Sequence, residues 1–231
     1  MSLDGKIILI TGATGALGRR LTQAFADEGA HLALAARTFH ALYEMENELL
    51  GRNRKAVAFP CDVRYEDEVI RLVHRVVNRF GRIDCLITAA SASGPRQPVL
   101  DYPLDPWRDV ISTNLTGTFL MCREVLPWML RQNAGSIINV TSGVTSGKAG
   151  FGAYLASKCA VEGMTRMLAA ETRESGVRVN MVDVGMPKSE KRAAEFPPEV
   201  VGPFTWLATD ESSKTNGKRI VAAEFTMPTP A

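Results

Sequence analysis

The sequence predicts an α/β fold in which a parallel β-sheet carries helices on both faces. Short apolar runs alternate with longer segments whose apolar residues recur at the helical spacing. The short runs are apolar almost throughout, which is typical of strands that are buried on both faces. No linker, internal repeat or low-complexity segment interrupts this order, so residues 1–231 are interpreted as one domain.

Four strands and three helices are predicted in the first half of the chain. The strands span residues 6–11, 31–36, 56–61 and 83–88. The helices span residues 16–28, a segment that ends near residue 50, and residues 66–80. Gly29 and Gly81 directly follow two of these helices, and glycine commonly ends a helix because it adopts the left-handed conformation without strain.

Three helices and three strands are predicted in the second half. A long helix covers residues 107–130 and is expected to bend near Pro127, because proline removes a helix hydrogen bond. The segments that follow are a strand at 136–140, a helix at 151–173, a strand at 177–182, a helix at 198–208 and a strand at 219–223. Residues 186–198 are polar and rich in proline, so a mobile loop is expected there.

The composition argues against several classes of function. The formal net charge is +2 and the basic residues are scattered, which does not favour binding to nucleic acid or to a membrane surface. No stretch approaches the ~20 apolar residues that a membrane helix needs. No signal peptide precedes the first predicted strand, so a cytoplasmic protein is expected.

The cysteines do not indicate a disulfide framework or a metal site. Cys61, Cys85, Cys122 and Cys159 lie far apart and form no C-x-x-C pair. Each lies within an apolar run, which favours small buried thiols in a reducing compartment. No cluster of acidic residues and histidines indicates another metal site.

A glycine-containing loop joins the first predicted strand to the first predicted helix. Residues 11–18 read Thr-Gly-Ala-Thr-Gly-Ala-Leu-Gly. Small residues let the backbone approach the pyrophosphate of a dinucleotide, and the start of the helix offers free N–H groups. The simpler alternative is a tight strand–helix turn, because glycine spacing alone is a weak signal. The position directly after a buried strand favours the dinucleotide site.

The residues after the second and third strands indicate which dinucleotide is bound. A site that prefers NAD usually has a carboxylate after the second strand to bind the ribose 2′-hydroxyl, but residues 35–38 contain no Asp or Glu. Arg37 could instead neutralise a 2′-phosphate, which favours NADP(H), although it could also be a solvated loop residue. Asp62 could accept a hydrogen bond from the adenine amino group or cap the next helix.

A tyrosine and a lysine lie four residues apart in a predicted helix, so Tyr154 and Lys158 share one helix face. A free tyrosine titrates near pH ~10, and a neighbouring ammonium is expected to lower its pKa. Tyr154 could then exchange a proton with a carbonyl or alcohol oxygen, and Ser142 could hydrogen-bond the same oxygen. Such pairs also occur by chance on surface helices, so the prediction depends on Ser142 and on the glycine loop.

Together these motifs resemble the short-chain dehydrogenase/reductase family, from about Lys6 to Val221. Their order and spacing make the resemblance highly specific. The matching segments are residues 11–18, 61–63, 81–84, 114–117, 138–142, 154–158, 177–180 and 204–211.

The resemblance implies a doubly wound, Rossmann-type parallel sheet of seven strands in the order 3-2-1-4-5-6-7. It also implies a catalytic set of Asn114, Ser142, Tyr154 and Lys158, in which Lys158 binds the nicotinamide ribose and Asn114 holds a water. From the sequence alone, Asn114 reads more simply as a helix-kink or capping residue. The expected contacts to NADP(H), with NAD(H) also possible, are Gly12, Thr14, Gly15, Leu17, Gly18, Arg37, Asp62, Val63, Ala90, Tyr154, Lys158, Gly185 and Ser189.

The sequence departs from the family pattern at several positions. The second glycine of the loop is at position 15 and is followed by Ala16. Residues 88–91 read Thr-Ala-Ala-Ser, so an Asn that normally ties down the sheet and a Gly beside the cofactor are lost. Val184 and Gly185, preceded by Asp183, replace the usual Pro-Gly.

The segment that usually covers the substrate is also short. Residues 189–198 are too few for the family's two covering helices, so a small or open lid is expected over the substrate. A neighbouring subunit could complete the site, because family members usually form homodimers or homotetramers, often through the helices that contain Asn114 and Tyr154.

Three functional hypotheses follow. The first is an NADP(H)-dependent carbonyl reductase or alcohol dehydrogenase that acts on a small molecule. The second is a catalytically weak or inactive NADP(H)-binding sensor or scaffold, which residues 88–91 and the short lid segment favour. The third is an epimerase or dehydratase with tightly held NAD, which only the glycine spacing favours.

Overall fold

One parallel sheet organises the chain. The computed structural model describes residues 3–143, 147–185 and 196–228. Seven strands pair in the order β3-β2-β1-β4-β5-β6-β7, which confirms the predicted topology. The strands are β1 (Ile7–Thr11), β2 (His31–Ala36), β3 (Lys55–Pro60), β4 (Cys85–Thr88), β5 (Gly135–Thr141), β6 (Val177–Asp183) and β7 (Arg219–Val221).

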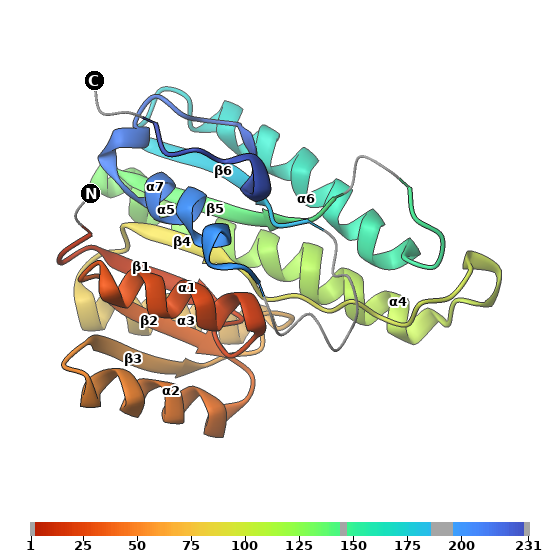
Figure 1. The fold of residues 1–231 in the computed structure, drawn as a ribbon, viewed down its shortest axis with the longest axis horizontal. Helices are drawn as coiled ribbons and strands as arrows, with labels where there is room; N and C mark the ends of the chain where they lie inside the picture. The colour runs from red at the N-terminus through yellow and green to blue at the C-terminus, as the bar shows by residue number, and fades with distance from the viewer. Residues whose placement is uncertain (1–2, 144–146, 186–195, 229–231) are drawn as a thin grey trace.

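Helices cover both faces of the sheet, as Figure 1 shows with α1 in front of the strands and α3 behind them. One apolar cluster joins the sheet to α1, α2 and α7, and the other joins it to α3, α5 and α6. The helices are α1 (Ala16–Asp27), α2 (Phe39–Gly51), α3 (Glu66–Phe80), α4 (Leu104–Ile111), α5 (Gly117–Gln132), α6 (Gly152–Glu171) and α7 (Gly202–Ala208).

Successive residues of the central strands point into the two different cores. In β1, Ile8 and Ile10 belong to one cluster and Leu9 belongs to the other, and all three are fully buried. Because successive side chains of a strand point to opposite faces, a strand covered on both faces must be apolar throughout. This explains the uninterrupted apolar runs that predicted the strands.

The helix predicted over residues 107–130 is interrupted at a different place from the one expected. A π-helical turn, Ser112–Thr116, separates α4 from α5, whereas α5 continues through Pro127. A π turn inserts one extra residue and redirects the side chains around it, and such turns are frequent at functional sites. Asn114 lies in this turn and is fully buried.

Other boundaries differ only slightly from the prediction. The helix predicted over 198–208 begins with a 3₁₀ turn, Pro198–Val201, before α7.

The prediction of four buried thiols is wrong for one of them, because Cys159 is exposed while the other three cysteines are buried. Its neighbour Lys158 faces the sheet, and successive residues of a helix point about 100° apart.

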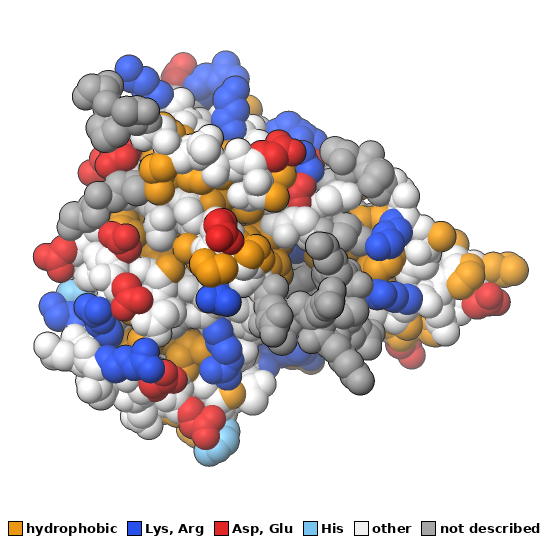
Figure 2. All heavy atoms as spheres, in the orientation of Figure 1, with side chains coloured by type: hydrophobic (Ala, Val, Ile, Leu, Met, Phe, Trp, Pro, Cys, Tyr) orange, Lys and Arg blue, Asp and Glu red, His pale blue; other side chains and the backbone are white. Residues whose placement is uncertain are grey.

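The segment around α4 projects from the body of the protein at the end toward which the strands point (Figure 1). Val99 and Leu100, just before α4, are 77% and 94% exposed, and Leu104 is 58% exposed. Figure 2 shows apolar side chains at the tip of this projection. Exposed apolar groups that gather in one place often mark an interaction surface. No helix within the described ranges is long and apolar enough to cross a membrane.

Candidate active site

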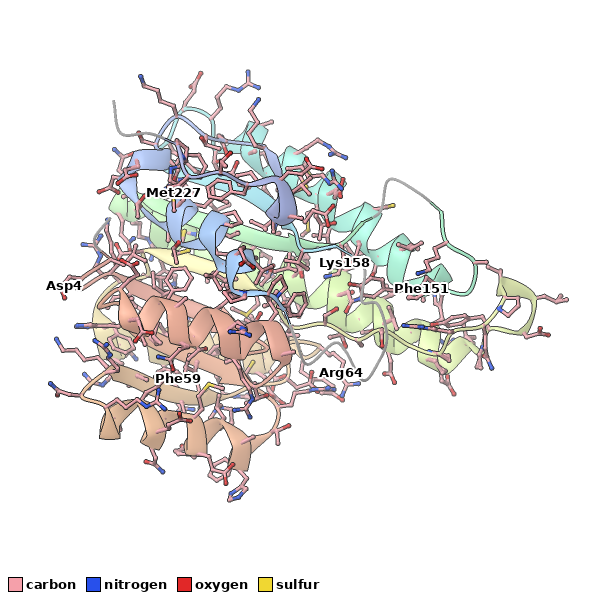
Figure 3. All side chains as sticks on the ribbon, viewed as in Figure 1. Asp4, Phe59, Arg64, Phe151, Lys158 and Met227 are labelled. Carbon is pink, nitrogen blue, oxygen red and sulfur yellow. The ribbon has the colours of Figure 1, made fainter. Side chains whose placement is uncertain are left out.

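The residues expected to act together lie at the carboxyl ends of the strands. Figure 3 shows Arg64, Phe151 and Lys158 at this end of the molecule and Asp4 at the opposite end. In parallel α/β sheets, ligands bind in crevices outside the carboxyl ends of the strands. The loops after β1, β2, β3 and β4 line one cavity here, and Ser142 and Gly143 directly follow β5.

The backbone of the loop between β1 and α1 lies close to the backbone of the loop that follows β4. Gly12 has a φ of +66°, and a Cβ atom there would lie 2.7 Å from Ala90 Cα. A Cβ on Gly18 would lie 2.7 Å from Ala13 Cα, so a side chain is excluded at both positions. Gly15 has an ordinary φ of −71° and precedes the first residue of α1. The altered glycine spacing therefore leaves the two sterically required glycines in place.

A cavity of about 160 Å³ opens beside this loop. The first N–H groups of α1 have no partner within the helix, so they are available to an anion at this point. The cavity brings together many of the predicted cofactor residues. It is lined by Gly12, Thr14, Gly15, Ala36, Arg37, Thr38, Cys61, Asp62, Val63, Ala89, Ala90, Ser91 and Thr113. Three features fit the phosphates of a dinucleotide: the glycines at which a side chain is excluded, the free N–H groups at the start of α1, and the guanidinium of Arg37.

Asp62 has a partner that the sequence analysis missed. Arg64 donates to its carboxylate from Nη2 at 2.7 Å and from Nε at 3.0 Å, and from its backbone N–H at 3.1 Å. Burial opposes ionisation of Asp62, but the hydrogen bonds from Arg64 outweigh it and hold the pKa of this carboxyl below its usual range. An adenine amino group would therefore share the carboxylate with Arg64. The two-residue spacing was the available signal, since Asp side chains commonly bond the backbone two residues on.

One face of α6 is joined to β5 by a series of polar contacts. Lys158 Nζ donates to the carbonyl oxygen of Val140 at 2.9 Å. Glu162 Oε1 accepts from the hydroxyl of Thr141 at 3.0 Å. Tyr154, Lys158 and Glu162 are spaced by four residues, so they lie along one side of the helix. These contacts fix the position of α6 relative to β5 along the strand direction, and they thereby fix the position of Tyr154.

The phenol of Tyr154 lies between two serine hydroxyls. Tyr154 is 6% exposed and hydrogen-bonds the side chains of Ser142 and Ser91. Burial raises the pKa of the phenol, the bond to Ser142 opposes that rise, Asp183 adds to it, and the bond to Ser91 opposes it. The net pKa is raised, whereas the sequence analysis expected Lys158 to lower it. Burial outweighs the effect expected of the ammonium, which donates to Val140 and lies 5.8 Å from the ring centroid.

Lys158 is itself strongly affected by its surroundings. The residue is 2% exposed, and burial lowers the pKa of its ammonium to about 8. Removing an ammonium from water disfavours its charged form. At pH 7 the side chain remains mainly protonated, so it can act as a hydrogen-bond donor and as a positive charge near Tyr154.

Asn114 holds the loop after β4 against α6. Its Nδ2 atom donates to Ala92 O at 2.9 Å and to the Ser157 hydroxyl at 3.0 Å, and its Oδ1 atom accepts from Ala92 N at 2.7 Å. Its backbone carbonyl accepts from the hydroxyl of Thr118 at 2.7 Å. These contacts support the structural interpretation of Asn114 as a helix-kink residue, and the water-holding role stays a prediction.

The Asn expected to tie down the sheet is absent, but another side chain joins β4 to β5. Thr88 Oγ1 donates to Asn139 Oδ1 at 2.8 Å, and Asn139 Nδ2 donates to Thr165 on α6 at 2.9 Å. A hydroxyl on β4 therefore replaces the missing amide. Ser91, which stands where the family has Gly, adds a hydroxyl beside Tyr154 and also lines the cavity. The sequence analysis missed this contact because it treated the replacement only as a loss.

Gly185 lies beside the site, where its carbonyl oxygen accepts from the Ser142 hydroxyl at 2.7 Å. Leu17 is buried in α1 behind the glycine loop. Ser189 lies outside the described residues, as does most of the predicted lid segment 186–198, so the expected small lid stays a prediction. Within the described part of the chain, no group of three or more His, Cys, Asp or Glu side chains could hold a metal ion.

Sequence comparison finds related proteins along most of the chain. The profile of the short chain dehydrogenase family matches residues 6–199. L-fucose dehydrogenase from Oryctolagus cuniculus is 35% identical over 182 residues, which cover 78% of this chain and 62% of that protein. The 3-oxoacyl-[acyl-carrier-protein] reductase FabG from Thermotoga maritima is 35% identical over 239 residues, which cover 95% of this chain and 97% of that protein.

Solved structures share the same fold over nearly the same length. An NAD⁺-bound xylitol dehydrogenase has a TM-score of 0.88 at 28% identity, and the match covers 96% of this chain and 98% of that one. A short chain dehydrogenase from Shigella flexneri 2a, complexed with NADP, also has a TM-score of 0.88 at 28% identity. That match covers 96% of this chain and 98% of the Shigella protein.

Proposed function

The chain belongs to the short chain dehydrogenase family, and on that premise we propose that it transfers hydride between NADP(H) and the carbonyl or secondary alcohol of a small molecule. One observation carries this proposal. Ser91 lines the cavity beside the glycine loop and also hydrogen-bonds Tyr154. The proposed acid–base group therefore adjoins the space where the dinucleotide would bind.

The proposed reaction assigns one task to each side chain. Bound NADPH would supply the hydride in reduction, and NADP⁺ would accept it in oxidation. Tyr154 gives its proton to the carbonyl oxygen as negative charge develops there, and it takes the proton back in the reverse direction. The Ser142 hydroxyl, which donates to Gly185 O without substrate, would turn to donate to the same oxygen when substrate binds. Lys158 holds positive charge near the phenol and would bind the nicotinamide ribose.

The raised pKa of Tyr154 suits reduction at neutral pH. A general acid must be protonated when the substrate arrives, and burial keeps this phenol protonated. Oxidation needs the phenolate and should therefore require a more alkaline solution. The site thus favours the carbonyl reductase direction under neutral conditions.

A preference for NADP(H) over NAD(H) is supported by charge. Arg37 lines the cavity after β2, and residues 35–38 contain no carboxylate to bind a ribose 2′-hydroxyl. A guanidinium binds phosphate in a bidentate manner, so Arg37 would favour the 2′-phosphate. One solved neighbour contains NADP and another contains NAD⁺, so binding of NAD(H) as a weaker cofactor is also proposed.

The alternative of an inactive sensor or scaffold is less well supported. Residues 88–91 were its main motive, but Thr88 restores the tie between strands and Ser91 adds a contact to Tyr154. The third hypothesis, an epimerase or dehydratase, rested on the glycine spacing. The two sterically required glycines occupy the same places under either interpretation, so the spacing gives it no support.

A homodimer or homotetramer is also proposed. The helices on one side of the molecule expose apolar side chains: Phe119 and Leu130 on α5 are 43% and 44% exposed, and Met167 on α6 is 49% exposed. Exposed apolar side chains on neighbouring helices favour association between copies.

The four free thiols are compatible with a reducing compartment, so a cytoplasmic location is inferred.

The experiment that tests the proposed function is a substrate panel. Purified protein is incubated with NADPH and with aldehydes, ketones, quinones, keto-sugars and 3-oxoacyl esters, and NADPH oxidation is followed by absorbance. Turnover of at least one carbonyl compound, abolished in Tyr154→Phe, is expected. NADPH binding without turnover of any panel member would favour the scaffold hypothesis instead.

A further inference from the structure

The carboxylate of Asp183, the last residue of β6, joins the loops that follow β5 and β6. Its Oδ1 atom accepts hydrogen bonds from the backbone N–H groups of Gly143 and Gly185, each at 2.8 Å. Ser142 directly precedes Gly143 and donates its hydroxyl to Gly185 O at 2.7 Å. The carboxylate therefore closes a ring of contacts around the serine that is proposed to touch the substrate.

Arg219 neutralises the other oxygen of Asp183. The Nη2 atom of Arg219, on β7, pairs with Asp183 Oδ2. Arg219 Nε also lies 3.2 Å from Glu162 Oε1 on α6, without the alignment of a hydrogen bond. Glu162 in turn accepts from Thr141 on β5 at 3.0 Å. One arginine thus connects β6, β7 and α6 directly behind the proposed site.

The carboxylate of Asp183 lies in buried surroundings. Asp183 is 4% exposed, and its strand neighbour Val182 is fully buried. A buried carboxylate is costly unless it is paired and hydrogen-bonded, and apolar residues often replace a buried ion pair without loss of stability. Arg219 therefore offsets the cost of burying Asp183, and the carboxylate remains available to the two N–H groups of the neighbouring loops.

We propose that Asp183 is a positioning residue, which Arg219 holds in place and which fixes the Ser142 hydroxyl against the Tyr154 phenol. The inference rests on the proposed function, because it gives Asp183 a part in the same reaction. Asp183 acts through the backbone of Gly143 and Gly185. Its side chain is used by those two N–H groups and by Arg219.

The charge of Asp183 also acts on the phenol. Burial raises the pKa of Tyr154 most, and Asp183 adds to that rise. The charged groups around the phenol are Lys158 on α6, Asp183 on β6 and the Arg219 paired with it, with Glu162 one turn beyond Lys158. Without the charge of Asp183, the phenolate would form at lower pH. Reduction would then fall off at lower pH, and oxidation would begin at lower pH.

The test compares Asp183→Asn with a matched control, Asp84, which lies at the opposite end of the strands, directly before β4. Asp84 is 8% exposed, accepts from the Ile7 N–H at 2.8 Å, and accepts from Arg82 Nε at 2.9 Å. Asp183→Asn keeps an acceptor for the two N–H groups but turns an amide NH2 toward Arg219, so Arg219 no longer holds the side chain in place. It should lower kcat by up to about 100-fold, with little change in NADPH affinity, and should move the pH profile to lower pH. Asp84→Asn should lower the melting temperature but leave kcat and the pH profile unchanged.

A second variant keeps the proposal testable if Asp183→Asn does not fold. Arg219→Gln leaves the charge of Asp183 unneutralised, so the pH profile should move to higher pH, in the opposite direction. Equal kcat and equal profiles in wild type and Asp183→Asn would overturn the proposal. It would also be overturned if Asp84→Asn lost as much kcat, because the effect would then be one of stability.

A measurement without substrate separates this inference from the proposed function. Ultraviolet absorbance follows formation of the Tyr154 phenolate, as the difference between each protein and its Tyr154→Phe counterpart. Asp183→Asn should titrate at lower pH than wild type. If wild type reduces no carbonyl compound but this shift is seen, the proposed function fails while the influence of Asp183 on Tyr154 stands. No shift would contradict that influence.

Discussion

The ammonium of Lys158 donates to the carbonyl oxygen of Val140 at 2.9 Å, although Tyr154 lies one helical turn away. The contact joins α6 to the next-to-last residue of β5, and Ser142 follows that strand directly. The carboxyl end of β5 therefore positions Lys158 and Tyr154 as well as Ser142. The chemistry proposed for this site depends on that shared support.

Replacing Tyr154 by Phe should lower kcat by about 10²- to 10⁴-fold, because the proton donor is lost while the ring still fills its buried position. NADPH affinity, measured by fluorescence titration, should change little. Tyr43→Phe on α2, which removes a hydroxyl on the opposite face of the sheet, is the matched control. Equal turnover in Tyr154→Phe and wild type would rule out Tyr154 as the acid.

Replacing Arg37 by Ala should weaken NADPH binding by about 10- to 100-fold, since a charge-assisted hydrogen bond to the 2′-phosphate is lost. NADH binding should change much less, because NADH has no such phosphate. Arg52→Ala, at the far end of α2, is the control for a general loss of positive charge. Equal weakening of both cofactors in Arg37→Ala would show that Arg37 does not read the phosphate.

The two serine hydroxyls beside Tyr154 should contribute unequally. Ser142→Ala should lower kcat by about 10²- to 10³-fold, as expected for a donor to the developing oxyanion. Ser91→Ala should cost less, because Ser91 stands where glycine serves in relatives. Both hydrogen bonds lower the pKa of Tyr154, so both variants should move the pH profile to higher pH, opposite to Asp183→Asn. A shift to lower pH in either variant would contradict this assignment.

Much of the fold could be predicted because the signals are local. The apolar runs around Ile8 and Leu9 reflect burial on both faces, and the glycines at 12 and 18 reflect backbone approaches that exclude a side chain. The sequence analysis interpreted Asn114 as a helix-kink or capping residue, but it did not predict the π turn itself. Helical spacing is the same on either side of it, and the turn is supported by Ala92 and by Ser157 on another helix.

Apart from the local pair Asp62 and Arg64, the contacts of the site that escaped prediction join residues that are distant in sequence. Asp183 and Arg219 are 36 residues apart and meet only because β6 and β7 are neighbours. The direction of the Tyr154 pKa also depended on burial, which the spacing of Tyr154 and Lys158 does not reveal. The spacing predicted that the Lys158 ammonium would stabilise the Tyr154 phenolate. In the folded protein, the cost of removing the phenolate from water is larger than this attraction.

Burial of Lys158 should lower the free energy of unfolding at neutral pH, although the proposed reaction needs this side chain. Its pKa falls from 10.5 to about 8, so between these values the unfolded chain binds a proton that the folded chain does not. Stability should therefore rise with pH across this window and be lower, and constant, below it. Lys158→Met removes the buried charge and should stabilise the protein at pH 7 by up to roughly 3 kcal/mol, while turnover is lost.

Urea denaturation at pH 7 and pH 10 measures this effect, with the exposed Lys214→Met as the control. Wild type should be more stable at pH 10 than at pH 7 relative to Lys158→Met, because only wild type carries the buried ammonium at pH 7. The Lys214 variant should follow wild type at both values. If Lys158→Met is instead less stable at pH 7, the bond to Val140 outweighs the cost of burying the charge, and Lys158 supports the fold as well as the reaction.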